Sequence, residues 1–201
     1  MTQSVKPAMA IADGRKRCWG DIENPLMRDY HDHEWGTPIH DDRKIFEFLI
    51  LEGMQAGLNW RTILDKRENF RRAFRGFEPA KVARFTARDV RRLLGDAGII
   101  RNRLKILAAI NNARRFIEVQ KEFGTFDRYI WGFVGGKPMQ SGLRSFASMP
   151  ARTPLSDRIS ADLKARGFKF VGSTVIYAHM QATGMVNDHL ITCFRYKELA
   201  R

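Results

Sequence analysis

The sequence predicts an all-α fold, and three observations support this class. Apolar residues recur at helical spacing, as Ile45, Phe46 and Leu49 do before Glu52. No stretch shows sustained alternation of apolar and polar residues with β-branched enrichment, which would indicate strands. Glycines, prolines and capping residues divide the chain into segments of helical length. With 201 residues the chain can form one well-packed domain, which we expect over residues 16–201, after a flexible tail at 1–15.

Eight to ten helices are expected in this domain. Asp41 or Asp42 can cap a helix that leads to Glu52, and a second helix is expected from about 61 to 74. Pro79 suits a first helical turn and Thr86 suits a cap, so that short helices follow at 79–85 and 87–94. The remaining helices are expected at 103–122, at 126–134, from a cap at Ser156 or Asp157 to Gly167, and at 173–183.

The charge balance is the clearest compositional feature. The chain has 35 Lys and Arg against 22 Asp and Glu, a formal net charge of +13, which favours a polyanionic partner such as nucleic acid. No apolar run approaches the roughly 18 residues of a membrane span, and the N-terminus lacks the apolar segment of a signal peptide. Two cysteines so far apart exclude a disulfide framework. We therefore expect a cytoplasmic protein that does not bind membranes.

The segment 51–60 groups residues that can recognise a ligand. Glu52 is a carboxylate at the end of an apolar helix, with no basic residue within five positions before it. Gly53 and Gly57 allow the backbone to turn, which leaves Leu58 at a tip and Trp60 just beyond. The ordinary alternative is a helix end with a surface glutamate, a glycine cap and two core residues.

Two pairs of soft metal ligands lie at opposite ends of the chain. His189 and Cys193 are four residues apart, which on a helical turn places both on one face. After a turn at residues 24–25, Cys18 can pair with His31 or with the alternate His33. Two thiolates and two imidazoles suit a closed tetrahedral Zn²⁺ site that joins the two ends. The alternatives are a buried free cysteine with a hydrogen-bonded histidine, or a catalytic metal site that uses His31 and His33.

The segment 94–103 is a glycine-containing hairpin between two expected helices. Its exposed amides lie at the N-terminus of the following helix, where a phosphate group is favoured. Arg101, Arg103 and Lys105 add positive charge at the same place. Such contacts hold a DNA backbone without reading its sequence, although an ordinary helical hairpin with a solvated basic face has the same pattern.

These segments together resemble the 3-methyladenine DNA glycosylase I family, bacterial base-excision repair enzymes of the helix-hairpin-helix superfamily. The resemblance extends from Arg17 to about Tyr196. It rests on six segments in order: 17–18, 30–36, 51–60, 96–101, 167–172 and 186–189. It implies an all-α, helix-hairpin-helix glycosylase-like fold, with the helix-hairpin-helix element at about 87–121 and N- and C-terminal segments (18–31 with 189–193) joined by one structural zinc.

The resemblance also assigns roles to individual residues. It implies a catalytic Glu52, which binds the base together with Tyr30, Trp35 and Trp60. It implies that Gln55 and Leu58 contact DNA, with Leu58 as a plug. The hairpin residues that would hold the DNA backbone are Gly98, Ile100, Arg101 and Arg103. The zinc ligands would be Cys18, His31, His189 and Cys193, which selects His31 over His33.

The implied activity is hydrolysis of the N-glycosidic bond of 3-methyladenine in alkylated double-stranded DNA, without a lyase step. Free 3-methyladenine would be the product, and no obligate protein partner is expected. Two departures from the family pattern stand out: Trp19 directly follows Cys18, one position early, and no counterpart is evident for the aspartate that other superfamily members place after the hairpin. A non-catalytic DNA-binding module with a structural zinc is the alternative function.

Overall fold

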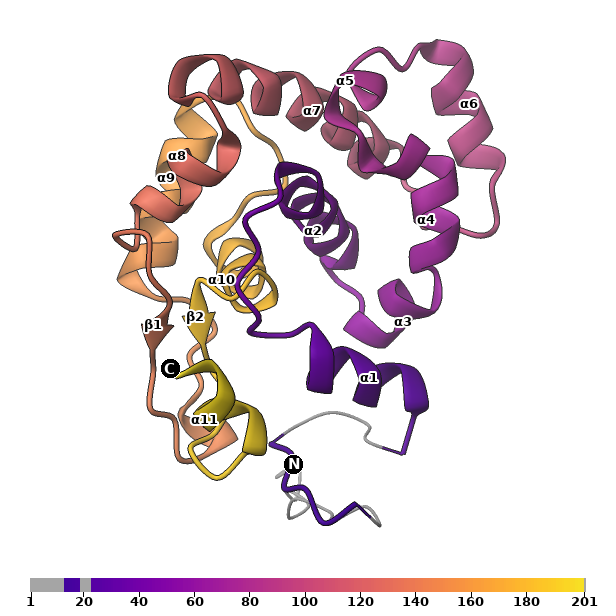
Figure 1. Cartoon of the computed structure of the whole chain (residues 1–201). Coiled ribbons are helices and arrows are strands. Elements are labelled where there is room, and N and C mark those ends of the chain that lie inside the picture. Colours follow the sequence, from indigo (N-terminus) through magenta and orange to yellow (C-terminus); the bar gives the residue numbers. More distant parts are fainter. Residues whose placement is uncertain (1–12, 19–22, 201) are drawn as a thin grey trace.

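The computed structural model describes residues 13–18 and 23–200, and the fold in this part of the chain is mostly helical (Figure 1). Eleven α-helices and two short 3-10 helices are present in it, one more α-helix than the upper limit of the prediction. The α-helices are α1 (Pro25–His33), α2 (Asp42–Gln55), α3 (Trp60–Asp65), α4 (Arg67–Ala73), α5 (Pro79–Val82), α6 (Ala87–Gly95), α7 (Arg103–Phe123), α8 (Phe126–Gly132), α9 (Pro154–Ala165), α10 (Ser173–Ala182) and α11 (Phe194–Leu199). The 3-10 helices are η1 (Arg75–Phe77) and η2 (Phe146–Ser148).

Helix α2 is the central element of the core. Asp41 caps it, because the aspartate side chain accepts a hydrogen bond from the Lys44 amide (2.8 Å). Every residue from Ile45 to Met54 is buried, and the helix packs against α3, α7, α8 and α10. A helix that is apolar on all sides belongs in the interior. Glu52 is thereby carried into the protein on the last turn of α2.

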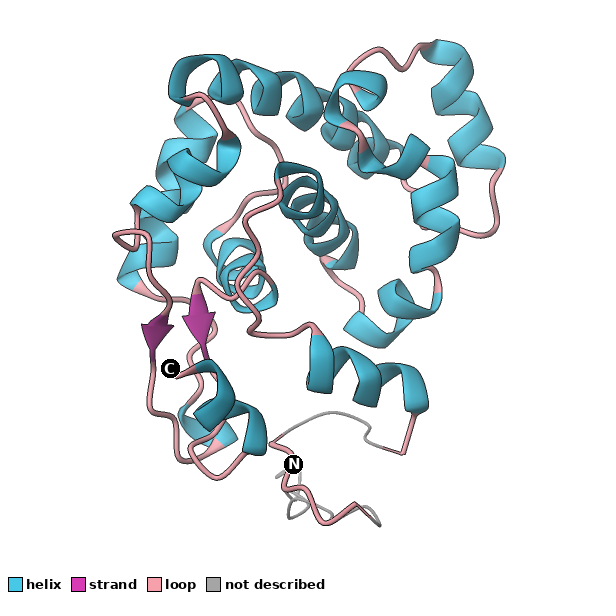
Figure 2. Cartoon of the chain, viewed as in Figure 1, coloured by secondary structure: helices cyan, strands magenta, loops and turns pink. Residues whose placement is uncertain are grey.

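The two ends of the chain meet on one side of the molecule, where Figure 1 places the N- and C-terminal segments close together. Strands β1 (Met139–Gln140) and β2 (Val186–Asn187) pair in parallel and are the only strands among residues 13–18 and 23–200 (Figure 2). At the start of α11 the Phe194 amide donates to the Lys16 carbonyl oxygen (3.0 Å). This contact connects the first described segment with the last helix.

Several predicted boundaries were wrong for identifiable reasons. The helix expected at 61–74 is interrupted at Lys66, which joins α3 to α4. Helix α9 begins at Pro154 because Thr153 and Ser156 form a reciprocal capping box, so the cap lies before the predicted Ser156 or Asp157. His189 and Cys193 do not lie on a helix; they belong to the turn between β2 and α11.

Helices α1 and α11 were not predicted from the sequence. At α1, the Asn24 side chain accepts hydrogen bonds from the Leu26 and Met27 amides, and Pro25 occupies the first helical position. The sequence predicted a turn at this Asn-Pro pair, although both residues also suit a helix start.

The tail predicted at 1–15 lies mostly outside the described residues. Within its last part, the Asp13 carboxylate pairs with Arg17 (2.6 Å). No helix in the described part is both long and apolar enough to cross a membrane.

Candidate active site and metal centre

A pocket of about 190 Å³ opens beside the C-terminal turn of α2, and we call it the Glu52 pocket. Five residues that the sequence nominated for base or DNA binding line it together, and four further lining residues were not nominated. The first five are Tyr30, Trp35, Glu52, Gln55 and Trp60. The others, Phe146, Met149, Ala178 and Gln181, come from η2, the residue that follows η2, and α10. A pattern search around Glu52 could not reveal them, because they lie about 90 or more positions further along the chain.

Glu52 is a buried carboxylate without a counter-ion among the described residues. Its exposed fraction is 4%, and burial raises the pKa of its carboxyl to about 8. Among the residues whose placement is described, none forms a hydrogen bond or ion pair with this carboxylate. A buried ionised group without a partner is costly, so a cationic or hydrogen-bond-donating ligand in the pocket would lower the free energy of the site.

Aromatic rings form the wall beside Glu52. Tyr30 comes from α1 and is almost fully buried, and its ring centroid lies 5.3 Å from that of Trp60. Phe48 of α2 stacks on Trp60 from behind at 6.3 Å. Burial, and next the nearby charge of Glu52, raise the pKa of the Tyr30 hydroxyl well above its usual range. Tyr30 therefore stays a neutral hydroxyl beside a planar aromatic surface.

The polypeptide after Glu52 projects from the molecule at the rim of the pocket. Helix α2 ends at Gln55, and Gly57 adopts a positive φ of 79° that glycine tolerates well. The turn is closed by the Leu58 amide, which donates to the Gln55 carbonyl oxygen (2.6 Å). Leu58 remains 45% exposed, so an aliphatic side chain stands in solvent next to the pocket.

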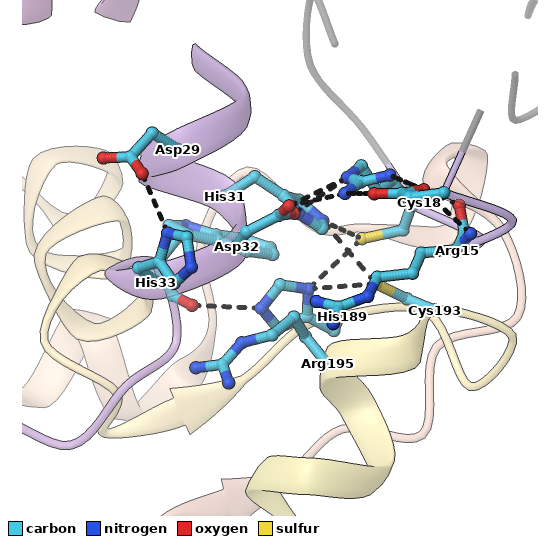
Figure 3. A network of polar contacts seen from close by, with 12 residues as sticks. Arg15, Cys18, Asp29, His31, Asp32, His33, His189, Cys193 and Arg195 are labelled. Atoms are coloured by element: carbon cyan, nitrogen blue, oxygen red, sulfur yellow. Dashed lines mark hydrogen bonds and ion pairs between the residues drawn. The ribbon is translucent and has the colours of Figure 1, made fainter. Parts of the chain in front are cut away.

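Four side chains from the two ends of the chain converge on one point (Figure 3). The Cys18 Sγ atom lies 3.4 Å from both His31 Nε2 and His189 Nδ1, and Cys193 Sγ lies 3.6 and 3.5 Å from the same two atoms. All four atoms are within 4.8 Å of one another. With ordinary Zn–S and Zn–N bond lengths, tetrahedral ligands lie about 3.5 Å apart. The residues present therefore fit a zinc ion with four protein ligands.

The surrounding contacts orient both imidazoles toward that point. His31 Nδ1 donates to the Asp32 carboxylate (2.8 Å), and Arg17 holds Asp32 in turn (2.6 Å). His189 Nε2 donates to the Trp35 carbonyl oxygen (3.0 Å). Such outer partners fix the tautomer of a metal-binding histidine. Since Trp35 also lines the Glu52 pocket, the cluster and the pocket share a wall.

His33 is not part of this cluster. Its side chain is 68% exposed and pairs with Asp29 on the outer side of α1 (2.9 Å). The alternative of a catalytic metal held by His31 and His33 therefore lacks support, because the two imidazoles face different directions (Figure 3). Trp19, which departs from the family pattern by one position, lies outside the described residues.

The segment between α6 and α7 forms a tight hairpin. Gly98 leaves no room for a side chain, because a Cβ atom there would lie 2.9 Å from Asp96 Oδ1 and 3.0 Å from Asn69 Cγ. Its amide donates to Asp96 Oδ1 (2.8 Å). In the described part of the chain no acceptor is recorded for the amides of Ile100 and Arg101. Ile100 packs partly against the core, while Arg101 and Arg103 are exposed.

Two basic side chains are occupied inside the protein, and the sequence had assigned one of them, Lys105, to the phosphate-binding surface. Lys105 is 8% exposed, and its ammonium group donates to the carbonyl oxygens of Met54 (2.8 Å) and Ala56 (2.6 Å) at the end of α2. Arg67 is buried between Glu34 and Glu47. These two side chains cannot contact DNA phosphates in this fold.

His179 is buried on α10, and neither ring nitrogen has a hydrogen-bond partner among the residues that the structure describes. Burial lowers the pKa of its imidazole to about 4, so the ring is neutral near pH 7. The neutral ring of His179 therefore packs in the core in the way that an apolar side chain does.

Comparison with known proteins places this geometry in a family. A family model described as methyladenine glycosylase matches residues 19–196. The chain belongs to the methyladenine glycosylase family. A DNA-3-methyladenine glycosylase 1 of Escherichia coli (strain K12) is 47% identical over 181 residues, which cover 90% of this chain and 97% of that protein. The alternative of a non-catalytic DNA-binding module is therefore wrong: a methyladenine glycosylase is a monofunctional enzyme that acts on alkylated DNA.

Solved structures of the methyladenine glycosylase family share the fold. A crystal structure of a 3-methyladenine DNA glycosylase I superimposes with a TM-score of 0.86 at 47% identity and covers 89% of this chain and 98% of that one. A second structure is a tyrosine-to-phenylalanine variant of a 3-methyladenine DNA glycosylase I in complex with 3-methyladenine. Its TM-score is 0.84 at 35% identity, with 86% of this chain and 92% of that chain covered.

Proposed function

We propose that this glycosylase turns a 3-methyladenine nucleotide out of alkylated duplex DNA into the Glu52 pocket. There it hydrolyses the N-glycosidic bond and leaves an abasic site. The observation that carries the proposal is the buried Glu52 carboxylate, which lies in one pocket with the rings of Tyr30 and Trp60 and has no counter-ion within the described part of the chain. The complex of a relative with 3-methyladenine supports the choice of base.

Charge and shape explain the selection of this base. Adenine methylated at N3 in DNA is cationic, whereas the normal bases are neutral. A cationic ring gains from contact with an aromatic face such as that of Trp60, and its exocyclic amine can donate to the Glu52 carboxylate. The unfavourable free energy of the buried, ionised carboxylate is largest when the pocket is empty. A cationic base therefore lowers the free energy of the complex more than a neutral base does.

The reaction is a hydrolysis in which the bond between N9 of the base and C1′ of the sugar breaks. The electron pair of that bond goes to the base, which leaves as neutral 3-methyladenine. A water molecule supplies the hydroxyl group that bonds to C1′, and its second proton passes to the solvent. Positive charge on the sugar increases in the transition state, and the anionic Glu52 in its low-dielectric surroundings would stabilise it. Because the cationic base is a good leaving group, the lability of its N-glycosidic bond accounts for much of the reaction rate.

The exposed elements around the pocket suit a DNA duplex. Leu58 would enter the gap in the base stack that the flipped nucleotide leaves, with Gln55 beside it at the pocket rim. The α6–α7 segment would act as a helix-hairpin-helix element, in which the amides of Ile100 and Arg101 just before α7, together with the cations of Arg101 and Arg103, hold the phosphate backbone.

Zinc would have a structural role in this enzyme. Cys18, His31, His189 and Cys193 would hold it, and the ion would supply a crosslink between the ends of the chain that is stable in a reducing compartment. Protein side chains would fill all four coordination positions of the ion. The ion would therefore not bind the DNA, and the residues of the Glu52 pocket would bind the reacting nucleotide instead. We expect the enzyme to act in the cytoplasm as a monomer without an obligate protein partner.

The test is release of bases from methylated duplex DNA by the wild-type protein and by Glu52→Ala. The freed bases are separated and identified by chromatography, and abasic sites are detected by alkaline strand cleavage. We expect the wild type to release 3-methyladenine with an equal number of abasic sites, and the variant to release it at least about 100-fold more slowly. A folded wild-type protein that binds this DNA but releases no base would contradict the proposal.

A further inference from the structure

Gln181 stands out among the pocket residues that sequence reasoning did not identify. It lies on α10 and lines the Glu52 pocket. Its side-chain amide reaches Asp188, the residue immediately before the zinc-ligand candidate His189, with 2.7 Å between Gln181 Nε2 and Asp188 Oδ2. Asp188 is fully buried and also accepts a hydrogen bond from the Tyr177 hydroxyl at the same oxygen (2.5 Å).

These contacts fix which way the Gln181 amide points. Nε2 is the amide atom that donates to Asp188 Oδ2, an oxygen that already accepts from Tyr177, so the –NH₂ group of Gln181 faces Asp188. The same nitrogen lies 3.4 Å from Met149 Sδ, a second weak acceptor. The carbonyl oxygen Oε1 is then the side of the amide that remains for a ligand, and no described residue donates to it. The Gln181 amide, although neutral, thus offers a ligand a hydrogen-bond acceptor, Oε1, whose orientation is fixed.

We propose that Gln181 is a specificity-determining residue that presents Oε1 to the exocyclic amine of the flipped adenine, with Asp188 as its positioning residue. This inference rests on the proposed function. An amine carries two hydrogens, and Glu52 and Gln181 then provide one acceptor each. A guanine-type base has a carbonyl oxygen at the corresponding ring position. That oxygen would face the acceptor Oε1 without a proton between them, and a site whose polar groups stay unpaired rejects its ligand strongly.

The measurement compares the release of 3-methyladenine and 3-methylguanine from the same methylated DNA. For Gln181→Leu we expect kcat/KM for 3-methyladenine to fall at least about tenfold, as for the loss of one hydrogen bond to a charged partner. The value for 3-methylguanine should change little or increase. The adenine-to-guanine selectivity therefore falls. Titration with the two free bases, followed by tryptophan fluorescence, should show the same loss of preference in binding.

Asp188→Asn tests the positioning role separately. An asparagine amide can donate as well as accept, so Gln181 is no longer held in one orientation and can present its –NH₂ group instead. Selectivity should then move toward the carbonyl-bearing 3-methylguanine beyond the level of Gln181→Leu. If Asp188→Asn does not fold, the selectivity of Gln181→Leu alone decides the inference.

The matched control is Gln120→Leu. Gln120 also donates from Nε2 to an aspartate, Asp42 (2.7 Å), but it lies outside the pocket on α7; its loss should leave the selectivity unchanged. A wild type that releases 3-methyladenine together with a Gln181→Leu variant of unaltered selectivity would refute the role of Gln181 and leave the proposed function intact. If the wild type releases neither base, both proposals fail.

Discussion

Glu52, the residue that we propose recognises the base, lowers the stability of the free protein when its carboxyl is ionised. Its carboxyl is buried next to aromatic rings, and its pKa is raised to about 8 from an unfolded value of 4.5. The folded state therefore holds a proton that the unfolded state releases between pH 4.5 and 8. Stability falls as the pH rises through this window, by roughly 5 kcal/mol at most. In the proposed function the cationic base supplies the compensating charge, which no described residue provides.

Replacing Glu52 should accordingly stabilise the free protein. Glu52→Gln removes the ionisable group with little change in shape, so we expect its Tm to exceed that of the wild type at pH 9 and to approach it at pH 5. Thermal unfolding at the two pH values checks this. Glu198→Gln, a change on exposed α11, should show no such difference; a Glu52→Gln variant less stable than wild type at pH 9 would contradict the burial argument.

At the scale of residues, the sequence indicated candidate functional residues but did not show which of them lie close together in the fold. The absence of nearby basic residues drew attention to Glu52, and the glycines around it indicated an exposed Leu58. No sequence pattern around Gln181 indicated a role, because its proposed role depends on the contact with Asp188 and on the packing of α10 against α2. The same holds for His179, because only the packing shows that its ring nitrogens have no partner among the described residues.

At the scale of elements, α7 supports the end of α2. The Lys105 ammonium bridges the carbonyl oxygens of Met54 and Ala56, which are among those that a helix end leaves unsatisfied. Burial lowers the pKa of Lys105, but the two carbonyls still receive its hydrogens. The hairpin that would grip DNA and the segment that carries Leu58 are thereby joined by one side chain.

Lys105→Met should uncouple these two elements. We expect a loss of about 1–3 kcal/mol in the free energy of unfolding and slower excision from duplex DNA, while binding of free 3-methyladenine changes less, because Leu58 and not the pocket loses its support. Denaturant unfolding and single-turnover excision measure the two effects. The control is Lys121→Met, an exposed position on the same helix; equal effects at both positions would refute the coupling.

The helical class and most of the helices could be predicted because apolar spacing and caps are local properties. The breaks could not. Whether Lys66 divides one helix into two depends on how α3 and α4 pack, and the helix start at Asn24 has the same residues as a turn. Lys105 was assigned to the DNA surface because sequence spacing does not show which basic side chains point inward.

At the scale of the whole molecule, a zinc ion held by Cys18, His31, His189 and Cys193 would close nearly the entire chain into a loop. Removal of zinc with a chelator, or the substitution Cys193→Ser, should lower Tm on the order of 10 °C and reduce activity together with it. Calorimetry with metal analysis would detect both. The matched control His33→Ala should retain zinc and Tm, since that imidazole is exposed; purified protein without zinc, and with a Tm unaffected by zinc or by Cys193→Ser, would contradict a structural site.

The overall charge should appear in the salt dependence of DNA binding. The logarithm of the binding constant is expected to fall by about 0.9 per phosphate contact for each log unit of salt. Arg101→Ala or Arg103→Ala should reduce that slope by about one unit for any DNA sequence. Arg128→Ala, on α8 away from the hairpin in Figure 1, serves as the control. An unchanged slope for both hairpin variants would place the DNA on another surface.

The most direct test of the central claim is the pH dependence of kcat/KM for excision of 3-methyladenine by wild type and Glu52→Gln. This parameter reports ionisations of the free enzyme. If the Glu52 carboxylate captures the cationic base, the wild-type value rises with pH and levels off above about 8, the pKa that burial gives to this carboxyl. The variant should be slow and should lack that rise. A wild-type profile that is flat between pH 6 and 10, or a variant that keeps both the rate and the rise, would show that Glu52 is not the group on which recognition depends.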